Sequence, residues 1–156
     1  YKRQILLFSR LTTCGSCRSE PINWPKPTLG SVDLSYLSLR KGIPAFAAIL
    51  KEERELMCLV KPLFETEDAA ARRSGVLPDD AYEGVLNDLI RDVNALPYAQ
   101  AVNVTHSPVT GNAGTREFFL HVRLGWDKGP AVDLAQKARQ AVERALQLSL
   151  YEKNNG

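Results

Sequence analysis

Three ionisable residues stand out in the sequence because of the segments that carry them. Asp33 lies in "SVDLSYL", Lys61 interrupts the apolar run "LMCLVKPLF", and Glu117 opens the apolar segment "EFFLHVRLGW". A lysine in apolar surroundings has a lowered pKa unless a carboxylate pairs with it, and Asp33 and Glu117 are the natural partners of Lys61. Together the three could form a catalytic cluster or a buried ion-pair cluster, and the residue types alone fit both.

Regular elements that could position these residues begin near Ser31. Continuous apolar or alternating runs predict strands, and apolar residues at helical spacing predict helices. The predicted strands cover residues 31–37, 56–64, 99–105 and 117–126, with 56–64 fully buried; the predicted helices cover 39–55, 77–96 (beginning at Pro78 or Asp79) and 130–152; residues 65–75 form a loop or a short helix.

The order of these elements predicts where the three side chains meet. Strands that alternate with helices run parallel under crossover connections, whereas the last two strands have no helix between them and should form an antiparallel hairpin. Asp33 and Lys61 fall late in their strands, at the carboxyl edge, where open α/β sheets bind ligands. Glu117 is the first residue of the returning strand, so it comes back to the same edge below the loop 106–116.

Charged residues at strand ends have a simpler interpretation, because strand ends usually meet water. For any one of the three residues taken singly, a solvated edge is the more common explanation of the charge. Lys61 fits that interpretation least, since apolar residues flank it on both sides.

Composition and length place the chain among ordinary globular proteins. It has 156 residues, 44% of them hydrophobic and 24% charged, with a net charge of +2, which suits one domain with a real core. This small net charge neither indicates nor excludes binding to nucleic acid. The longest apolar run, residues 43–50, is far shorter than the roughly 20 residues that span a bilayer. We therefore expect no membrane partner and a cytoplasmic protein.

Cysteine chemistry is a weaker candidate. The chain has three cysteines, and an odd count argues against a disulfide framework. Cys14 and Cys17 form a C-x-x-C pair that could be half a zinc site or a redox pair. The other candidate ligands form no second pair, and no strand and helix flank "CGSC", so we interpret it as part of a loop and expect no metal.

Four motifs in order and register carry a resemblance to a known family. "VDLSYLSL", "LVKPLFE", "GVLPDDAYEGVL" and "SPVTGNAGTREFFL" resemble the FtsJ-like ribosomal RNA methyltransferases of the TlyA type, also called hemolysin-like. The match covers about residues 31–125. It implies an α/β fold of the class I (Rossmann-like) methyltransferase type, with a mostly parallel sheet, an antiparallel last strand and helices on both faces.

The resemblance also implies an activity. Such proteins use S-adenosylmethionine to methylate a ribose 2′-hydroxyl of ribosomal RNA, and they rely on a Lys-Asp-Lys-Glu tetrad. By motif, Asp33, Lys61 and Glu117 match its Asp, second Lys and Glu. Lys61 would draw a proton from the hydroxyl or stabilise the forming alkoxide. Asp33 and Leu34 would contact the cofactor.

Our hypothesis for the domain organisation follows from where the motifs start. We expect residues 31–156 to be the C-terminal portion of the methyltransferase domain and residues 1–30 to be an irregular segment outside the family sequence. The glycine-rich cofactor loop of this fold has no counterpart in residues 1–30, so we expect a truncated enzyme. A sheet reduced in this way exposes an edge, which predicts a homodimer.

The alternative is a non-catalytic α/β remnant that dimerises or binds RNA. Its basic residues could form a face that contacts phosphates, although most of them fit ordinary solvated charges equally well. These residues are Arg72, Arg73, Arg116, Arg123, Lys128, Arg139 and Arg144.

Overall fold

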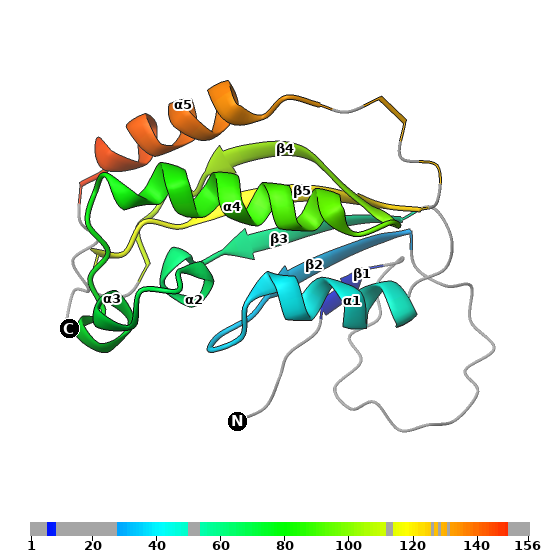
Figure 1. The fold of residues 1–156 in the computed structure, drawn as a ribbon, viewed down its shortest axis with the longest axis horizontal. Coiled ribbons are helices and arrows are strands. Elements are labelled where there is room, and N and C mark those ends of the chain that lie inside the picture. The colour runs from blue at the N-terminus through cyan, green and yellow to red at the C-terminus, as the bar shows by residue number, and fades with distance from the viewer. Residues whose placement is uncertain are drawn as a thin grey trace.

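A mixed five-stranded sheet with helices beside it makes up the described part of the chain (Figure 1). The computed structural model describes residues 6–8, 28–49, 54–111, 114–125, 127, 129–130 and 132–149. The strands are β1 (Leu6–Phe8), β2 (Leu29–Asp33), β3 (Arg54–Val60), β4 (Ala99–His106) and β5 (Phe118–Leu124). The helices are α1 (Leu39–Ile49), α2 (Pro62–Glu65), α3 (Ala69–Ser74), α4 (Ala81–Ala95) and α5 (Ala135–Leu146).

Strand direction agrees with the sequence pattern, but strand pairing is less parallel than predicted. Along the sheet the order is β1-β2-β3-β5-β4. The parallel pair is β2 with β3, and β5 runs antiparallel to both of its neighbours, β3 and β4. The strands β2, β3 and β4 therefore point the same way, and the predicted hairpin of the last two strands is confirmed. Because β5 inserts between β3 and β4, these two strands do not pair with each other, and the sheet is mixed.

The edge beside β2 is occupied by β1. Strand β1 pairs antiparallel with β2, with Leu6 opposite Ser31. The remaining residues of the segment 1–30, up to residue 27, lie outside the described residues, including Cys14 and Cys17. Since β1 takes that edge, a homodimer through it has no support here, and self-association stays a prediction.

The long helices form one layer, so the expectation of helices on both faces is wrong for the described residues. The crossovers from β2 to β3 through α1, and from β3 to β4 through α4, move in the same direction along the sheet. Right-handed crossovers that move in the same direction place their helices on the same face. Helix α4 contacts both α1 and α5, and Figure 1 shows α4 running along the sheet beside α5.

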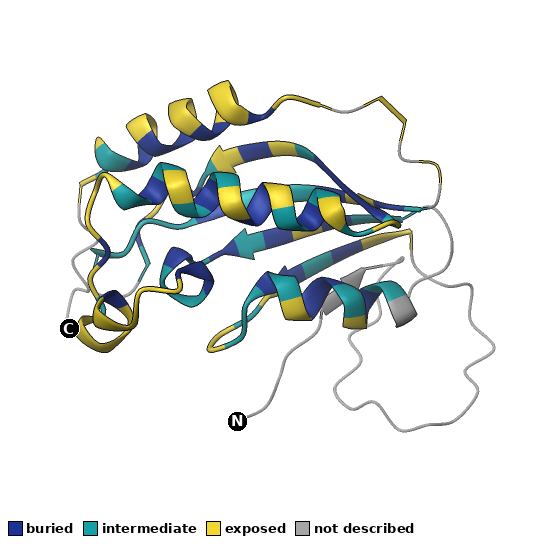
Figure 2. Ribbon diagram, viewed as in Figure 1, coloured by how far each residue is buried: buried dark blue, intermediate teal, exposed yellow. Residues whose placement is uncertain are grey.

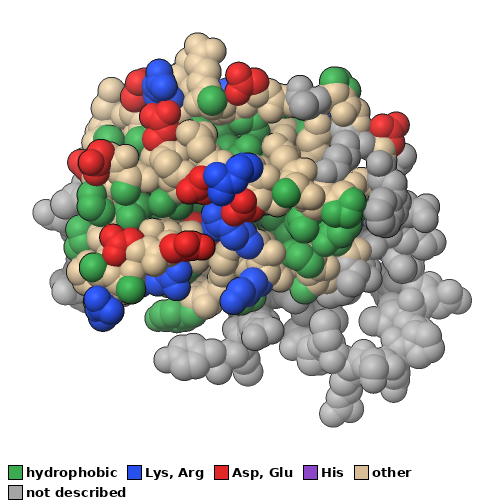
Figure 3. All heavy atoms as spheres, viewed as in Figure 1, with side chains coloured by type: hydrophobic (Ala, Val, Ile, Leu, Met, Phe, Trp, Pro, Cys, Tyr) green, Lys and Arg blue, Asp and Glu red, His purple; other side chains and the backbone are tan. Residues whose placement is uncertain are grey.

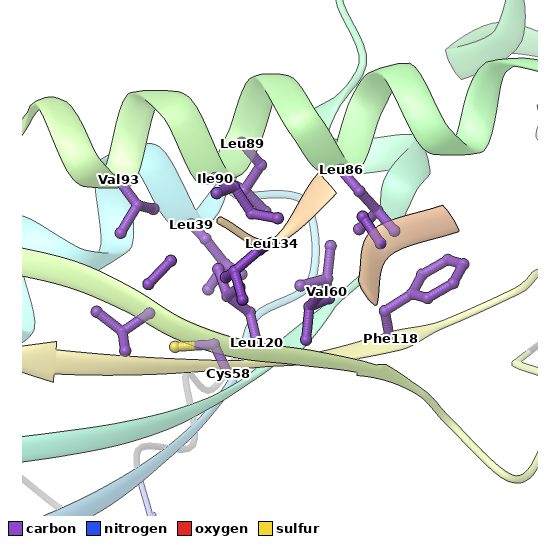
Figure 4. Packing of buried hydrophobic residues seen from close by; sticks show 14 of the residues in the cluster. Leu39, Cys58, Val60, Leu86, Leu89, Ile90, Val93, Phe118, Leu120 and Leu134 are labelled. Atoms are coloured by element: carbon purple, nitrogen blue, oxygen red, sulfur yellow. The ribbon is translucent and has the colours of Figure 1, made fainter. Parts of the chain in front are cut away.

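Burial along β3 shows the same one-sided cover. Leu56, Cys58 and Val60 are fully buried, whereas Met57, on the opposite face, is 39% exposed. In Figure 4, side chains of α4, including Leu89, point onto the buried face of the sheet. The prediction of a strand buried on both faces is therefore wrong for the described residues, because they place helices against one face only.

The helices bury one stripe each. In Figure 2 the buried residues of α4 and α5 follow stripes along each helix, with exposed residues between them. The stripe of α4 matches the predicted apolar spacing. It consists of Tyr82, Leu86, Leu89, Ile90 and Val93. Figure 3 shows the outer surface of this side of the molecule, where Lys and Arg side chains are interspersed with Asp and Glu. No described helix is long and apolar enough to cross a membrane.

Element ends differ from the predictions at prolines and caps. Strand β3 ends at Val60, because Pro62 cannot donate a hydrogen bond to a strand ladder and instead opens α2. Lys61 is thus the residue that joins β3 to α2. Helix α4 begins at Ala81, with Asp80 at the N-cap position, and α5 is shorter at both ends than predicted.

Candidate functional site

The ends of β2 and β3 bring Asp33 and Lys61 into contact. The two strands are parallel neighbours, and Asp33 pairs in register with Leu59, two residues before Lys61. Lys61 Nζ donates a hydrogen bond of 2.5 Å to Asp33 Oδ1 and lies 3.4 Å from Ser35 Oγ. Asp33 and Lys61 therefore lie together at the carboxyl edge of the sheet, as the sequence predicted.

Glu117 lies at the same edge. It directly precedes β5, whose first residue, Phe118, pairs with Val60 at the end of β3. The pKa of Glu117 is raised above its usual range by burial, while the charge of Lys61 lowers it and that of Asp33 raises it. All three predicted residues thus influence one another, and Glu117 holds its proton more tightly than an exposed carboxyl group.

The exposed fractions of the side chains favour a site that a substrate can reach over a buried structural ion pair. The side chain of Lys61 keeps 20% of its surface exposed and that of Asp33 keeps 63%. A purely structural pair in the interior would be closed to solvent on both sides. Here the amine is anchored by a carboxylate while part of it faces outward.

The loop before β5 is shaped around Glu117. The Ser107 amide donates to the Glu117 carbonyl at 2.8 Å, and the Gly111 amide donates to the Thr115 carbonyl at 2.7 Å. A Cβ atom at Gly111 would lie 2.5 Å from Glu117 Oε1 and 2.6 Å from Thr115 Oγ1. The glycine therefore lets the loop close over the carboxyl group, which accounts for the polar, glycine-bearing sequence at this point.

Replacing Gly111 with alanine is expected to displace the Glu117 side chain and so to change the pKa of that carboxyl group, which NMR titration measures. The displacement should also lower the free energy of unfolding by about 1–3 kcal/mol, as overpacking does, because Ser107 and Thr110 of this loop are buried. Gly84→Ala is the matched control: a Cβ there meets nothing within 4 Å, and an alanine inside α4 should stabilise the helix by about 1 kcal/mol. Equal pKa values of Glu117 in the two variants would refute a role for this close approach.

The titration of Glu117 predicts a dependence of stability on pH. The pKa of Glu117 is raised in the folded state, so the unfolded chain loses this proton at a lower pH than the folded chain does. As the pH rises from the unfolded pKa to the folded pKa, ionisation of Glu117 therefore lowers the stability of the folded state. Glu117→Gln should therefore gain stability relative to the unaltered chain above about pH 5 and show no such gain near pH 3. Urea unfolding of both proteins at both pH values measures this difference in the free energy of unfolding. A constant difference between the two proteins would contradict the prediction.

A pocket of about 670 Å³ adjoins the cluster. This volume lies within the range of small-molecule sites. Lys61 and Glu117 line it, and aromatic rings form part of its wall. Tyr36 has a positive φ of 64° and is 81% exposed, and its ring centroid lies 5.2 Å from that of Phe64. A bulky residue held in this backbone region beside a pocket is typical of a functional site.

Glu65, which the sequence analysis did not identify, anchors the segment behind the cluster. Its side chain is 1% exposed. It accepts hydrogen bonds from Ser38 Oγ at 2.6 Å, from the Leu39 amide at 2.8 Å and from Arg40 Nη1 at 3.0 Å. Arg40 Nε also donates to Asp92 Oδ2 at 2.6 Å. Glu65 therefore ties α2, which follows Lys61, to the start of α1. The sequence feature that could have pointed to Glu65 is its position as the carboxylate that ends the apolar segment "LVKPLFE".

Leu34 offers little side-chain surface to a ligand. It is partly buried, and a Cβ on Gly42 of α1 would lie 2.5 Å from Leu34 Cδ1. The side chain thus packs in part on α1. The role of Asp33 and Leu34 in cofactor binding stays a prediction.

Metal and thiol chemistry gain no support. The described residues contain no group of three or more His, Cys, Asp or Glu side chains that could hold a metal ion. Burial raises the pKa of Cys58 to about 12, with a smaller contribution from the charge of Glu65, so this thiol is inert. The pair Cys14 and Cys17 lies outside the described residues.

Comparison with known proteins identifies similar chains, although no family model matches. The chain is 28% identical over 128 residues to the "Putative rRNA methyltransferase YqxC" of Bacillus subtilis, covering 81% of this chain and 45% of that protein. It is 30% identical over 115 residues to the "16S/23S rRNA (cytidine-2'-O)-methyltransferase TlyA" of Mycobacterium tuberculosis, covering 73% of this chain and 41% of that protein. The chain thus spans less than half the length of these curated relatives.

Solved structures agree on the fold. A structure titled "Putative hemolysin from Streptococcus thermophilus" superimposes with a TM-score of 0.65 at 26% identity, covering 83% of this chain and 46% of that one. A hemolysin-titled structure from Lactococcus lactis superimposes with a TM-score of 0.66 at 21% identity, covering 81% of this chain and 59% of that one. The arrangement of strands and helices described above is therefore shared with proteins of this kind.

Proposed function

We propose that this chain, which belongs to the TlyA-type, hemolysin-like family of rRNA methyltransferases, takes part in methylation of a ribose 2′-hydroxyl of ribosomal RNA. The methyl donor in this proposal is S-adenosylmethionine. The observation that carries the proposal is the contact between Lys61 Nζ and Asp33 Oδ1, at the mouth of a pocket that Glu117 also lines. A fold of the class I methyltransferase type is part of the same proposal.

The cluster suits a reaction at a hydroxyl oxygen. A ribose hydroxyl is a weak nucleophile that must lose its proton as the new oxygen–carbon bond forms. Lys61, held by Asp33, would hydrogen-bond to that oxygen and either accept the proton as an amine or stabilise the developing negative charge as an ammonium ion. Glu117, with its raised pKa, would be a second ionisable group at the site, and the charge of Lys61 lowers that pKa.

The pocket suits a nucleotide. Its wall includes the rings of Tyr36, Phe64 and Tyr82, and RNA bases that leave their stack are bound on aromatic side chains. Tyr36 is the exposed member of the set and adjoins Ser35, whose hydroxyl lies 3.4 Å from Lys61 Nζ. A base stacked on Tyr36 would bring its ribose near the amine.

The cofactor fits the described residues only in part. The carboxyl end of β2 offers the exposed carboxylate of Asp33 and the backbone of Leu34, and the described residues contribute no glycine-rich loop beside them. When bound, S-adenosylmethionine supplies an already activated methyl group, so the protein mainly has to align the reacting atoms.

Calorimetric titration of S-adenosylhomocysteine into the chain tests the proposal. Measurable binding that Asp33→Ala weakens is the expected result. Asp88→Ala is the control, because Asp88 lies on α4 and pairs with Arg91 at the surface. No heat at high ligand concentration would refute cofactor binding by this chain.

One observation favours a second function. The sheet face opposite the helices, which includes Met57, is not covered by any described helix. Such a face would be compatible with a non-catalytic α/β module that acts by binding RNA or another protein chain. RNA binding without any cofactor binding is the outcome that would support this function over the first.

A further inference from the structure

Two arginines line the pocket beside the cluster without a carboxylate partner. Arg72 lies on α3 and Arg116 directly precedes Glu117, and both contribute to the pocket wall. Neither pairs with an acidic side chain among the described residues. Elsewhere on the described surface, Arg91 pairs with Asp88 and Arg139 pairs with Glu83. The positive charge of Arg72 and Arg116 is therefore available to a ligand.

Backbone carbonyl groups hold both guanidinium groups in place. Arg72 Nε donates to the Thr66 carbonyl at 2.6 Å, and Arg116 Nη1 donates to the Leu148 carbonyl at 3.0 Å. The carboxylate nearest to Arg72 in sequence, Asp68, is engaged as the N-cap of α3, where it accepts from two backbone amides. Each arginine is thus oriented by a neutral group, which leaves other N–H donors free for an anion.

The charges around the pocket favour an anionic ligand. Its lining contains Lys61, Arg72 and Arg116 against the single carboxyl group of Glu117. A planar guanidinium group forms two parallel hydrogen bonds to a phosphate, which makes arginine the common residue for phosphate recognition. In RNA, every ribose 2′-hydroxyl lies beside the 3′-phosphate of the same nucleotide, so a site that binds the hydroxyl must also accommodate a phosphate.

We propose that Arg72 and Arg116 form a phosphate-binding subsite that holds an RNA backbone phosphodiester next to the nucleotide at Lys61. The inference rests on the proposed function, because it assigns the substrate side of the same pocket. It divides the site into two parts, with Lys61, Asp33 and Glu117 at the hydroxyl and the two arginines at the adjoining backbone.

The test is the salt dependence of binding to a fluorescein-labelled, single-stranded hexaribonucleotide, measured by anisotropy. Each phosphate contact that is lost should reduce the slope of log affinity against log salt by about 0.7 for a single strand. Arg72→Gln and Arg116→Gln are each expected to reduce the slope by part of that amount and the double variant by about 0.7, because both arginines bind one phosphate. Glutamine keeps a donor for the carbonyl bond, and thermal melting confirms that each variant is folded.

Arg73→Gln is the matched control. Arg73 is the neighbour of Arg72 on α3 and is exposed, but it does not line the pocket. The same loss of slope for Arg73→Gln and Arg72→Gln, or no salt-dependent binding by the unaltered chain, would overturn the subsite.

Two further measurements separate failure of the subsite from failure of the proposed function. Calorimetry with S-adenosylhomocysteine should give the same affinity for Arg72→Gln as for the unaltered chain. A weaker affinity of Arg72→Gln would mean that the arginines bind the carboxylate of the cofactor, and would overturn an RNA subsite. Methyl transfer by the unaltered chain and by the arginine variants is the second measurement. Loss of slope in the arginine variants of a chain that transfers no methyl group would refute the function but leave the subsite standing.

Discussion

Replacing Lys61 with methionine is expected to lower the rate of methyl transfer to ribosomal RNA by about 10²–10⁴-fold, the range that a positioned acid–base group contributes. Methionine keeps much of the side-chain volume but removes the amine that hydrogen-bonds to Asp33. The loss should persist at saturating RNA concentration, so that it reflects the transfer step and not weaker binding. Single-turnover transfer of a radiolabelled methyl group measures the effect.

Lys41→Met is the control for this experiment. Lys41 lies on α1 and is exposed, and no described acidic side chain pairs with it. The loss of a positive charge is therefore the same in both variants, but only Lys61 adjoins the pocket. Comparable transfer rates for Lys61→Met and Lys41→Met would contradict a catalytic role for Lys61.

Replacing Glu65 with alanine is expected to lower the free energy of unfolding by about 3 kcal/mol, as removal of one member of a buried charged network does. The variant leaves the Ser38 hydroxyl, the Leu39 amide and Arg40 without their shared acceptor. It also detaches α2 from the start of α1, so Lys61 should lose part of its fixed position. The urea midpoint measures the loss.

Glu67→Ala serves as the reference for Glu65→Ala. Glu67 is two residues further along the chain and is exposed, so its removal should change stability by no more than about 0.5 kcal/mol. A loss for Glu65→Ala no larger than that for Glu67→Ala would show that the network contributes little to folding.

The sequence predicted the features that depend on local pattern. Alternating apolar segments indicated the strands, and the absence of a helix between residues 106 and 117 indicated the hairpin of β4 and β5. From these two features followed the shared edge at which Asp33, Lys61 and Glu117 now lie. The apolar spacing of α4 likewise determined which of its residues are buried.

Other features depend on order across the sheet, which no local pattern contains. The insertion of β5 between β3 and β4 makes the pairing mixed, and the common direction of the crossovers places α1 and α4 on one face. The apolar run around Met57 predicted cover on both faces, whereas the described helices cover one. Glu65 was missed because its partners Ser38, Leu39 and Arg40 are at least 25 residues away in sequence.

The measurement that tests the central claim most directly is nucleoside mass analysis of ribosomal RNA after incubation with this chain and S-adenosylmethionine. The cluster of Lys61, Asp33 and Glu117 predicts a methyl group on a ribose 2′-oxygen, present with the unaltered chain and lost with Lys61→Met. A methyl group on a base atom, transfer that survives Lys61→Met, or no transfer at all would contradict the assignment of this site.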